Sequence, residues 1–185
     1  MRKVILNLAL TLDGFIEGPN GEIDWIVKDS KIDFGDVLCD ILSDKDAIFY
    51  GRKSYEKWGN FKPDVQASQK LKDAYALLNS KQKYVFSTTK TGDDTNAIFI
   101  NKDIQEIVNA IKQQPGKNIW LYGGAEIVTT FLNLGLIDEY RLAIHPVIIG
   151  KGKPLFQDIE KWHRLKLVDA TSYPSGVLLV RYQVK

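Results

Sequence analysis

The segment Leu121-Tyr122-Gly123-Gly124-Ala125-Glu126 joins a short apolar run to a stretch of helical periodicity through two glycines. The segment Tyr50-Gly51-Arg52-Lys53-Ser54-Tyr55-Glu56 has the same order: an apolar strand, a glycine, and then the start of a helix. In an open α/β sheet, loops at the carboxyl ends of strands are the expected ligand sites, and helix amino termini attract anions. Both segments are candidate phosphate-binding turns, with a tight turn and a capped helix start as the structural alternatives.

Outward from these turns, strands alternate with amphipathic stretches over most of the chain. The pattern predicts strands near 4–10, 46–50, 84–88 and 119–122, and helices at 31–43, at 65–78, from Asp103 to Pro115, and between Gly124 and Gly135. In the first helix, Phe34, Val37, Leu38 and Ile41 recur at helical spacing. Three strands near 139–148, 163–171 and 176–184 close the chain. We therefore predict an α/β fold with three αβα layers, a mostly parallel central sheet and antiparallel C-terminal strands, in one domain over 1–185.

A third polar segment, Ser87-Thr88-Thr89-Lys90, follows the strand that ends near Phe86. Its hydroxyls and its lysine are suited to a phosphate monoester, such as the 2′-phosphate that distinguishes NADPH from NADH. The alternative is an ordinary polar loop.

The composition argues against several classes of function. The 185 residues include 25 basic and 23 acidic ones, and the net charge of +2 gives no reason to expect a nucleic-acid or membrane partner. The two histidines and one cysteine show no metal-ligand spacing, so we predict no metal site. The single Cys39 permits no intramolecular disulfide, and we expect a cytoplasmic protein.

The order and spacing of these motifs resemble the dihydrofolate-reductase-like superfamily, and within it the riboflavin-biosynthesis reductase, the C-terminal domain of the bifunctional deaminase-reductase. The resemblance spans nearly the whole chain. It rests on the two glycine turns and on five further segments: Ala9–Ile16 with its Thr-Leu-Asp-Gly core, Asp24-Trp25-Ile26, Leu136–Tyr140, His145–Gly152 and Pro154–Phe156.

The resemblance implies an NADPH-dependent oxidoreductase that transfers a hydride to a small heteroaromatic or carbonyl/imine substrate, as 5-amino-6-(5-phosphoribosylamino)uracil reductase does. Dihydrofolate reduction and a non-catalytic NADPH-binding module are the alternatives. The backbone at Ala9 and Leu10 would hold the nicotinamide carboxamide. The remaining cofactor contacts would come from three groups of residues: Gly51, Arg52, Lys53 and Ser54; Ser87 and Thr88; and Gly123, Gly124, Ala125 and Glu126.

The substrate side is less well defined. Asp13, Asp36 and an ordered water are the candidate proton sources, and Trp25 is a candidate wall for a flat ring. The first helix carries an acidic stripe that includes Asp36, whereas riboflavin reductases use basic residues there to hold a ribose phosphate. The segment Gly150-Lys151-Gly152-Lys153 lacks the pattern of a P-loop, and we interpret it as a turn with two exposed lysines. We interpret His145 as a strand-end residue.

The apolar tail 136–156 contains the continuous run Val147-Ile148-Ile149, which is difficult to bury at the edge of one small domain. Reductase domains of the riboflavin type commonly pair as two-fold dimers. We therefore predict a homodimer with the C-terminal strands near its interface.

Overall fold

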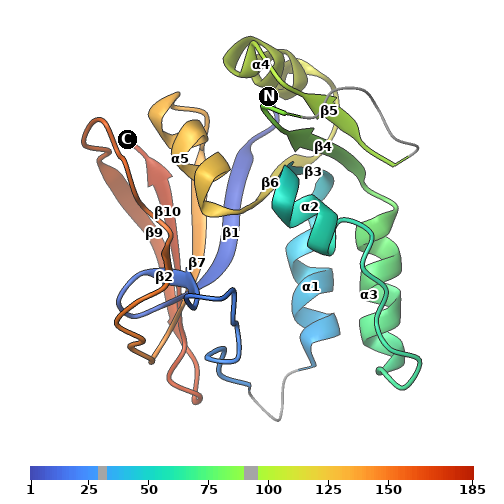
Figure 1. The fold of residues 1–185 in the computed structure, drawn as a ribbon, viewed down its shortest axis with the longest axis vertical. Helices are drawn as coiled ribbons and strands as arrows, with labels where there is room; N and C mark the ends of the chain where they lie inside the picture. Colours follow the sequence, from blue (N-terminus) through green and yellow to red (C-terminus); the bar gives the residue numbers. More distant parts are fainter. Residues whose placement is uncertain (29–32, 90–95) are drawn as a thin grey trace.

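The computed structural model describes residues 1–28, 33–89 and 96–185, and it contains one large twisted sheet with helices on both faces (Figure 1). The strand order in this sheet is β5-β4-β3-β6-β1-β7-β10-β9. Its strands are β1 (Val4–Thr11), β3 (Lys45–Gly51), β4 (Gln82–Phe86), β5 (Ile98–Ile100), β6 (Asn118–Gly123), β7 (Glu139–His145), β9 (Leu165–Ser172) and β10 (Leu178–Val184). The helices are α1 (Phe34–Ser43), α2 (Arg52–Trp58), α3 (Gln69–Asn79), α4 (Ile104–Gln113) and α5 (Ala125–Asn133).

The strand pairing confirms the predicted fold class. Strands β1, β3, β4, β5, β6 and β7 pair in parallel, and β10 pairs antiparallel with both β7 and β9. Two buried clusters lie on opposite faces of the sheet, one against α4 and α5 and the other against α1, α2 and α3. These clusters give the three αβα layers.

Three short strands were not predicted. Strand β5 has three residues, and the pair β2 (Phe15–Glu17) with β8 (Lys153–Pro154) has three and two. Segments this short hold too few alternating side chains to show a period of two. The pair β2–β8 lies outside the large sheet and ties the turn after β1 to the segment after β7.

The predicted first helix is present, but only part of its apolar stripe is buried. Phe34 and Val37 are exposed, whereas Leu38 and Leu42 are buried. Helix α1 packs against α3 at Gly35, where an added Cβ would lie 2.6 Å from the backbone of α3. The face of α1 that carries Gly35, the one glycine of this helix, therefore lies against α3. Residues 31 and 32, with which we expected the helix to begin, lie outside the described residues.

The end of α5 has the predicted glycine cap. Gly135 has a φ of +67°, and its N–H donates to the Leu132 carbonyl, while the Leu136 N–H donates to the Phe131 carbonyl. These two bonds form a Schellman motif, which turns the chain directly from α5 toward β7.

Candidate functional site

The two glycine turns lie against each other at the carboxyl ends of the neighbouring strands β3 and β6. A Cβ added at Gly51 would lie 3.6 Å from both the carbonyl oxygen of Gly123 and the nitrogen of Gly124. The Gly123–Gly124 peptide bond is cis. The structure thus brings together the two phosphate-binding turns that the sequence predicts separately.

A cavity of about 330 Å³ opens beside these turns. Its walls come from the amino ends of α2 and α5, from the segment after β4, from the start of α4, and from β8. The lining residues are Gly51, Arg52, Lys53, Ser54, Phe86, Ser87, Thr88, Thr89, Ile100, Asn101, Ile104, Gly124, Glu126, Ile127, Thr130 and Lys153. A volume of this size accommodates a small ligand or one end of a larger one.

The amino terminus of α5 is suited to an anion. Its N-cap is Gly124, which has no side chain to accept from the first N–H groups of the helix. Unpaired N–H groups and the positive end of the helix dipole therefore face the cavity at this point. Glycine at this position also leaves space above the backbone, since an added Cβ would lie 3.4 Å from Ser54 Oγ.

The two basic residues that follow Gly51, Arg52 and Lys53, form exposed ion pairs. Arg52 Nη1 donates to both carboxylate oxygens of Glu56, at 3.0 and 2.8 Å, and Lys53 Nζ lies 3.3 Å from Glu126 Oε1. Exposed pairs of this kind contribute little to stability, so a phosphate can replace either carboxylate at small cost. The Glu126 side chain serves here as a partner for Lys53, and its backbone lies in the first turn of α5.

Strand β1 separates from β6 where the nicotinamide end of the site is expected. The β1–β6 ladder stops at the pair Leu6–Leu121, whereas β1 stays paired with β7 as far as Thr11 and His145. The backbone of Ala9 and Leu10 therefore has no β6 partner on that side. Ala9 and Leu10 stay candidates for the contact with a carboxamide.

Aromatic side chains of β3 and β6 pack together next to β1, where the Trp120 indole N–H donates to the Asn7 carbonyl at 2.8 Å. Tyr122 packs against Tyr50, with ring centroids 4.8 Å apart, and against Trp120 at 5.0 Å. Burial raises the pKa of both tyrosines, so both phenols stay protonated at neutral pH. The Tyr50 hydroxyl is buried and has no hydrogen-bond partner among the residues that the structure describes. None of the three was predicted as a site residue, although each tyrosine directly precedes a glycine turn.

The two candidate carboxylates lie elsewhere. Asp13 accepts hydrogen bonds from Thr11 Oγ1 at 2.6 Å and from the Gly150 N–H at 2.7 Å. The bond from Thr11 lowers the pKa of Asp13, which is therefore ionised at neutral pH. Asp36 forms an exposed ion pair with Lys70 of α3, at 2.7 Å. Neither residue lines the cavity.

Trp25 lies beside the end of β7. Its ring meets His145 edge to face at a centroid distance of 5.5 Å, and the Val27 N–H donates to His145 Nδ1 at 3.1 Å. His145 is a strand-end residue, as predicted, and burial lowers its pKa. The imidazole thus holds the segment with Trp25 against the strand next to β1. Within the described part of the chain, Trp25 Nε1 is buried without a hydrogen-bond partner.

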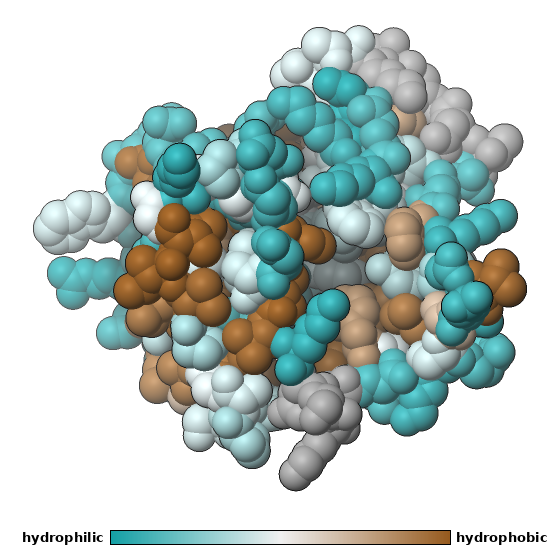
Figure 2. Space-filling model, turned by 60° about the horizontal axis from the view of Figure 1, so that its bottom comes forward, coloured by the Kyte–Doolittle hydropathy of each residue, from teal (hydrophilic) through white to brown (hydrophobic). Residues whose placement is uncertain are grey.

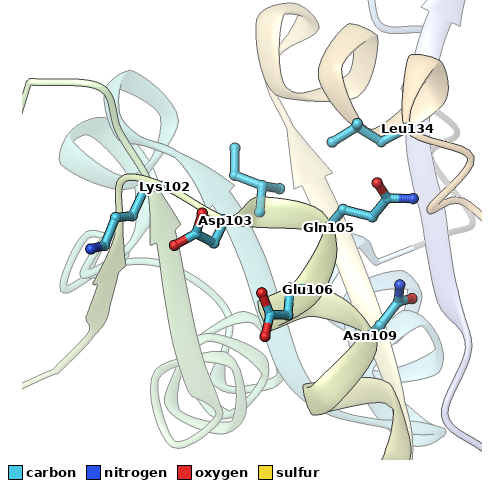
Figure 3. A pocket seen from close by; sticks show the side chains of 7 residues that line it. Lys102, Asp103, Gln105, Glu106, Asn109 and Leu134 are labelled. Atoms are coloured by element: carbon cyan, nitrogen blue, oxygen red, sulfur yellow. The ribbon is translucent and has the colours of Figure 1, made fainter.

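A wider surface depression near the start of α4 has a different character. It is lined by Lys102, Asp103, Ile104, Gln105, Glu106, Asn109 and Leu134, and its polar side chains do not converge on one point (Figure 3). The lining side chains carry charges of both signs and point apart, so they give no basis for selective binding there. Among residues 1–28, 33–89 and 96–185, no three His, Cys, Asp or Glu side chains form a cluster that could hold a metal. Over the same ranges, no helix is long and apolar enough to cross a membrane.

The interpretation of Gly150–Lys153 as a turn with two exposed lysines was wrong for one of them. Lys151 is exposed, but Lys153 is half-buried and lines the cavity. No local pattern reveals this, because the contact joins β8 to a turn about thirty residues earlier in the chain. Lys90, the predicted cation of the third segment, lies outside the described residues, while Ser87 and Thr88 line the cavity.

Comparisons with known proteins identify the family. The RibD C-terminal domain matches residues 2–179. The uncharacterized protein YyaP of Bacillus subtilis (strain 168) is 51% identical over 181 residues, covering 98% of this chain and 94% of YyaP. The uncharacterized protein YwjB of the same strain is 31% identical over 179 residues, covering 96% of each chain.

Solved structures share the fold at lower identity. A Shewanella sp. PV-4 protein named for riboflavin biosynthesis aligns with a TM-score of 0.79 at 21% identity, over 100% of this chain and 99% of its own. The Thermotoga maritima diaminohydroxyphosphoribosylaminopyrimidine deaminase/5-amino-6-(5-phosphoribosylamino)uracil reductase aligns with a TM-score of 0.69 at 18% identity, over 100% of this chain and 57% of its own. With a family match over nearly its whole length, the chain belongs to the RibD C-terminal domain family.

Proposed function

We propose that this protein is an NADPH-dependent reductase that acts on a small, flat heteroaromatic substrate. One observation carries the proposal: two glycine turns, the open amino terminus of α5 and the hydroxyls of Ser87 and Thr88 share a single cavity. The family supports it, because the Thermotoga maritima relative is named as a reductase of a pyrimidine.

The residues present fit a dinucleotide. A Cβ at Gly51 or Gly124 would occupy the space between the two turns, so glycine keeps this cradle open for an anion. Arg52 and the Ser87–Thr88 pair are suited to the 2′-phosphate, and Ser54 with the amino end of α5 to the diphosphate. The backbone of Ala9 and Leu10 would orient the carboxamide. Bound NADPH would supply the hydride.

The chain's own contribution is orientation and exclusion of water. Of the rings of Tyr50, Trp120 and Tyr122, only that of Tyr122 is partly exposed, and it is tilted by 35° to Tyr50 and by 50° to Trp120. A partly exposed aromatic face suits a planar heterocycle. Since Asp13 is ionised and Asp36 is paired with Lys70, we infer that an ordered water delivers the proton. Helix α1 has no basic side chain that could hold the phosphate of a phosphorylated substrate.

The proposed reductase activity is tested by measuring turnover. Absorbance of NADPH is followed with 5-amino-6-ribosylaminouracil, with its 5′-phosphate, and with dihydrofolate as separate substrates. We expect oxidation with the first, and slower oxidation with the other two. Binding of NADPH without oxidation of any candidate would favour a non-catalytic binding module, and faster turnover of dihydrofolate would overturn the substrate class.

The cofactor preference has a separate test. Arg52→Ala should weaken the binding of NADPH by about 10-fold or more and leave the binding of NADH almost unchanged, because only NADPH carries the 2′-phosphate. Lys57→Ala is the matched control, since Lys57 lies in the last turn of the same helix and does not line the cavity. Equal loss of both nucleotides would contradict the assignment of Arg52.

A further inference from the structure

The segment 149–155, which we call the strap, crosses from the end of β7 back over the turn that follows β1. Asp13 accepts from the N–H groups of Ile149 and Gly150, at 3.2 and 2.7 Å. Further along, the Leu155 N–H donates to the Gly14 carbonyl at 2.9 Å. The strap is therefore fastened at both ends to the Thr-Leu-Asp-Gly motif.

Between these fasteners the strap packs closely on β2. Gly152 has a φ of +156°, and an added Cβ would lie 2.2 Å from the carbonyl oxygen of Glu17. Glycine is needed here for both reasons: L-residues rarely adopt this conformation, and there is no room for a side chain. The close approach sets Lys153 opposite Glu17 in the β2–β8 pair.

The strap carries the Lys153 side chain to the second glycine turn. Lys153 Nζ lies 3.6 Å from the position of a Cβ at Gly124, and Ser54 Oγ lies 3.4 Å from the same point. The ammonium group and the hydroxyl thus bound the space above the amino end of α5. Lys151, two residues earlier, is exposed and does not line the cavity.

Lys153 also differs from the other cavity cations in its partners. Arg52 is paired with Glu56 and Lys53 with Glu126. Lys153 makes no ion pair with any residue in the ranges that the structure describes. An ammonium group held at a glycine turn without a carboxylate is a ready partner for an anion.

We propose that Lys153 binds the diphosphate of the dinucleotide, opposite Ser54 and the amino end of α5. The proposal rests on the proposed function, which it deepens by assigning a binding residue. Because the diphosphate is common to NADPH and NADH, Lys153 contributes to the affinity for both and does not select between them. The family resemblance assigned this segment no role in binding.

The test is calorimetric titration of the purified protein with NADPH, NADH and 2′-AMP. Lys153→Met keeps most of the aliphatic stem and removes the charge, and Lys151→Met is the matched control on the exposed side of the strap. We expect Lys153→Met to weaken the binding of NADPH and NADH alike, by about 10- to 100-fold, and to leave the affinity for 2′-AMP unchanged. Lys151→Met should bind all three as the wild type does.

Three results would overturn the assignment. Unchanged NADPH affinity in Lys153→Met, with binding intact in the wild type, rejects Lys153 alone and leaves the proposed function standing. A loss confined to NADPH and 2′-AMP places Lys153 at the 2′-phosphate instead. No binding of either dinucleotide by the wild type rejects the proposed function, and the Lys153 assignment with it. If circular dichroism shows Lys153→Met unfolded, Lys153→Arg and Lys153→Gln take its place, with affinity expected to be kept by the first and lost by the second.

Discussion

Replacing Gly124 by Ala should weaken cofactor binding strongly while sparing the fold. Gly124 has a φ of −77° and a ψ of −159°, an extended conformation that alanine adopts. The new Cβ would lie 3.4 Å from Ser54 Oγ and 3.6 Å from Lys153 Nζ, which are ordinary contacts. The folded protein without ligand therefore tolerates the methyl group. Because alanine lowers the conformational entropy of the unfolded chain, the substitution should stabilise the folded protein by roughly 0.4–1 kcal/mol.

The same methyl group takes the space that a phosphate needs. A phosphate oxygen that accepts from both Ser54 and Lys153 must lie in the gap above Gly124 that these two groups bound. Losing two charge-assisted hydrogen bonds costs about 3 kcal/mol at the low end of the usual range, or roughly a 100-fold rise in Kd.

The assay combines a thermal melt with fluorescence titration of NADPH. We expect Gly124→Ala to melt at or slightly above the wild-type temperature and to bind NADPH at least about 100-fold more weakly. An unchanged Kd in a normally folded variant would show that the turn is structural only. A large loss of stability would show that the space above Gly124 is needed by the fold itself.

Three further predictions concern the strap, pH and assembly. Asp13→Ala removes the acceptor that fastens the strap, so trypsin should cleave faster after the exposed Lys151; an unchanged rate would show that the strap does not depend on this carboxylate. Burial lowers the pKa of His145 below its ordinary value of 6.5, so the contribution of His145 to stability should be constant above that pH and decrease below it, because the unfolded chain takes up the proton first. Urea unfolding should show a flatter pH profile for His145→Gln, and an equal slope would assign the effect elsewhere. Ile148 is 71% exposed, and hydrophobic residues gather on the side of the molecule where β9 and β10 lie (Figure 2), so we propose that Ile148→Asp splits a homodimer; a wild-type mass of 21.0 kDa by light scattering would contradict this.

The sequence was sufficient for the fold because each long element has a clear period and a clear boundary. Helix α4 shows Ile104, Val108 and Ile111 at helical spacing, and Gly135 ends α5 by a local backbone motif. The glycine turns were found for the same reason, since a strand, a glycine and a helix follow one another directly. Information of this kind is local to the chain.

The features that could not be predicted from the sequence depend on packing between segments that are far apart in the chain. Phe34 matches the helical pattern of α1 but is 56% exposed, because the close contact at Gly35 rotates the helix toward α3. Lys153 looks like an exposed turn residue, and only the fastening of the strap to Asp13 and Glu17 brings it to the cavity. Asp13 stays a candidate proton source, and no local pattern indicates the hydrogen bonds that it accepts from Thr11 and Gly150.

A crystal structure of the protein grown with NADPH would test the central claim most directly. The account predicts the diphosphate between the Gly51 and Gly124 turns, with the first N–H groups of α5, Ser54 Oγ and Lys153 Nζ within hydrogen-bond distance, and the nicotinamide beside Ala9. Nucleotide bound elsewhere on the molecule, or an empty cavity at saturating NADPH, would contradict it.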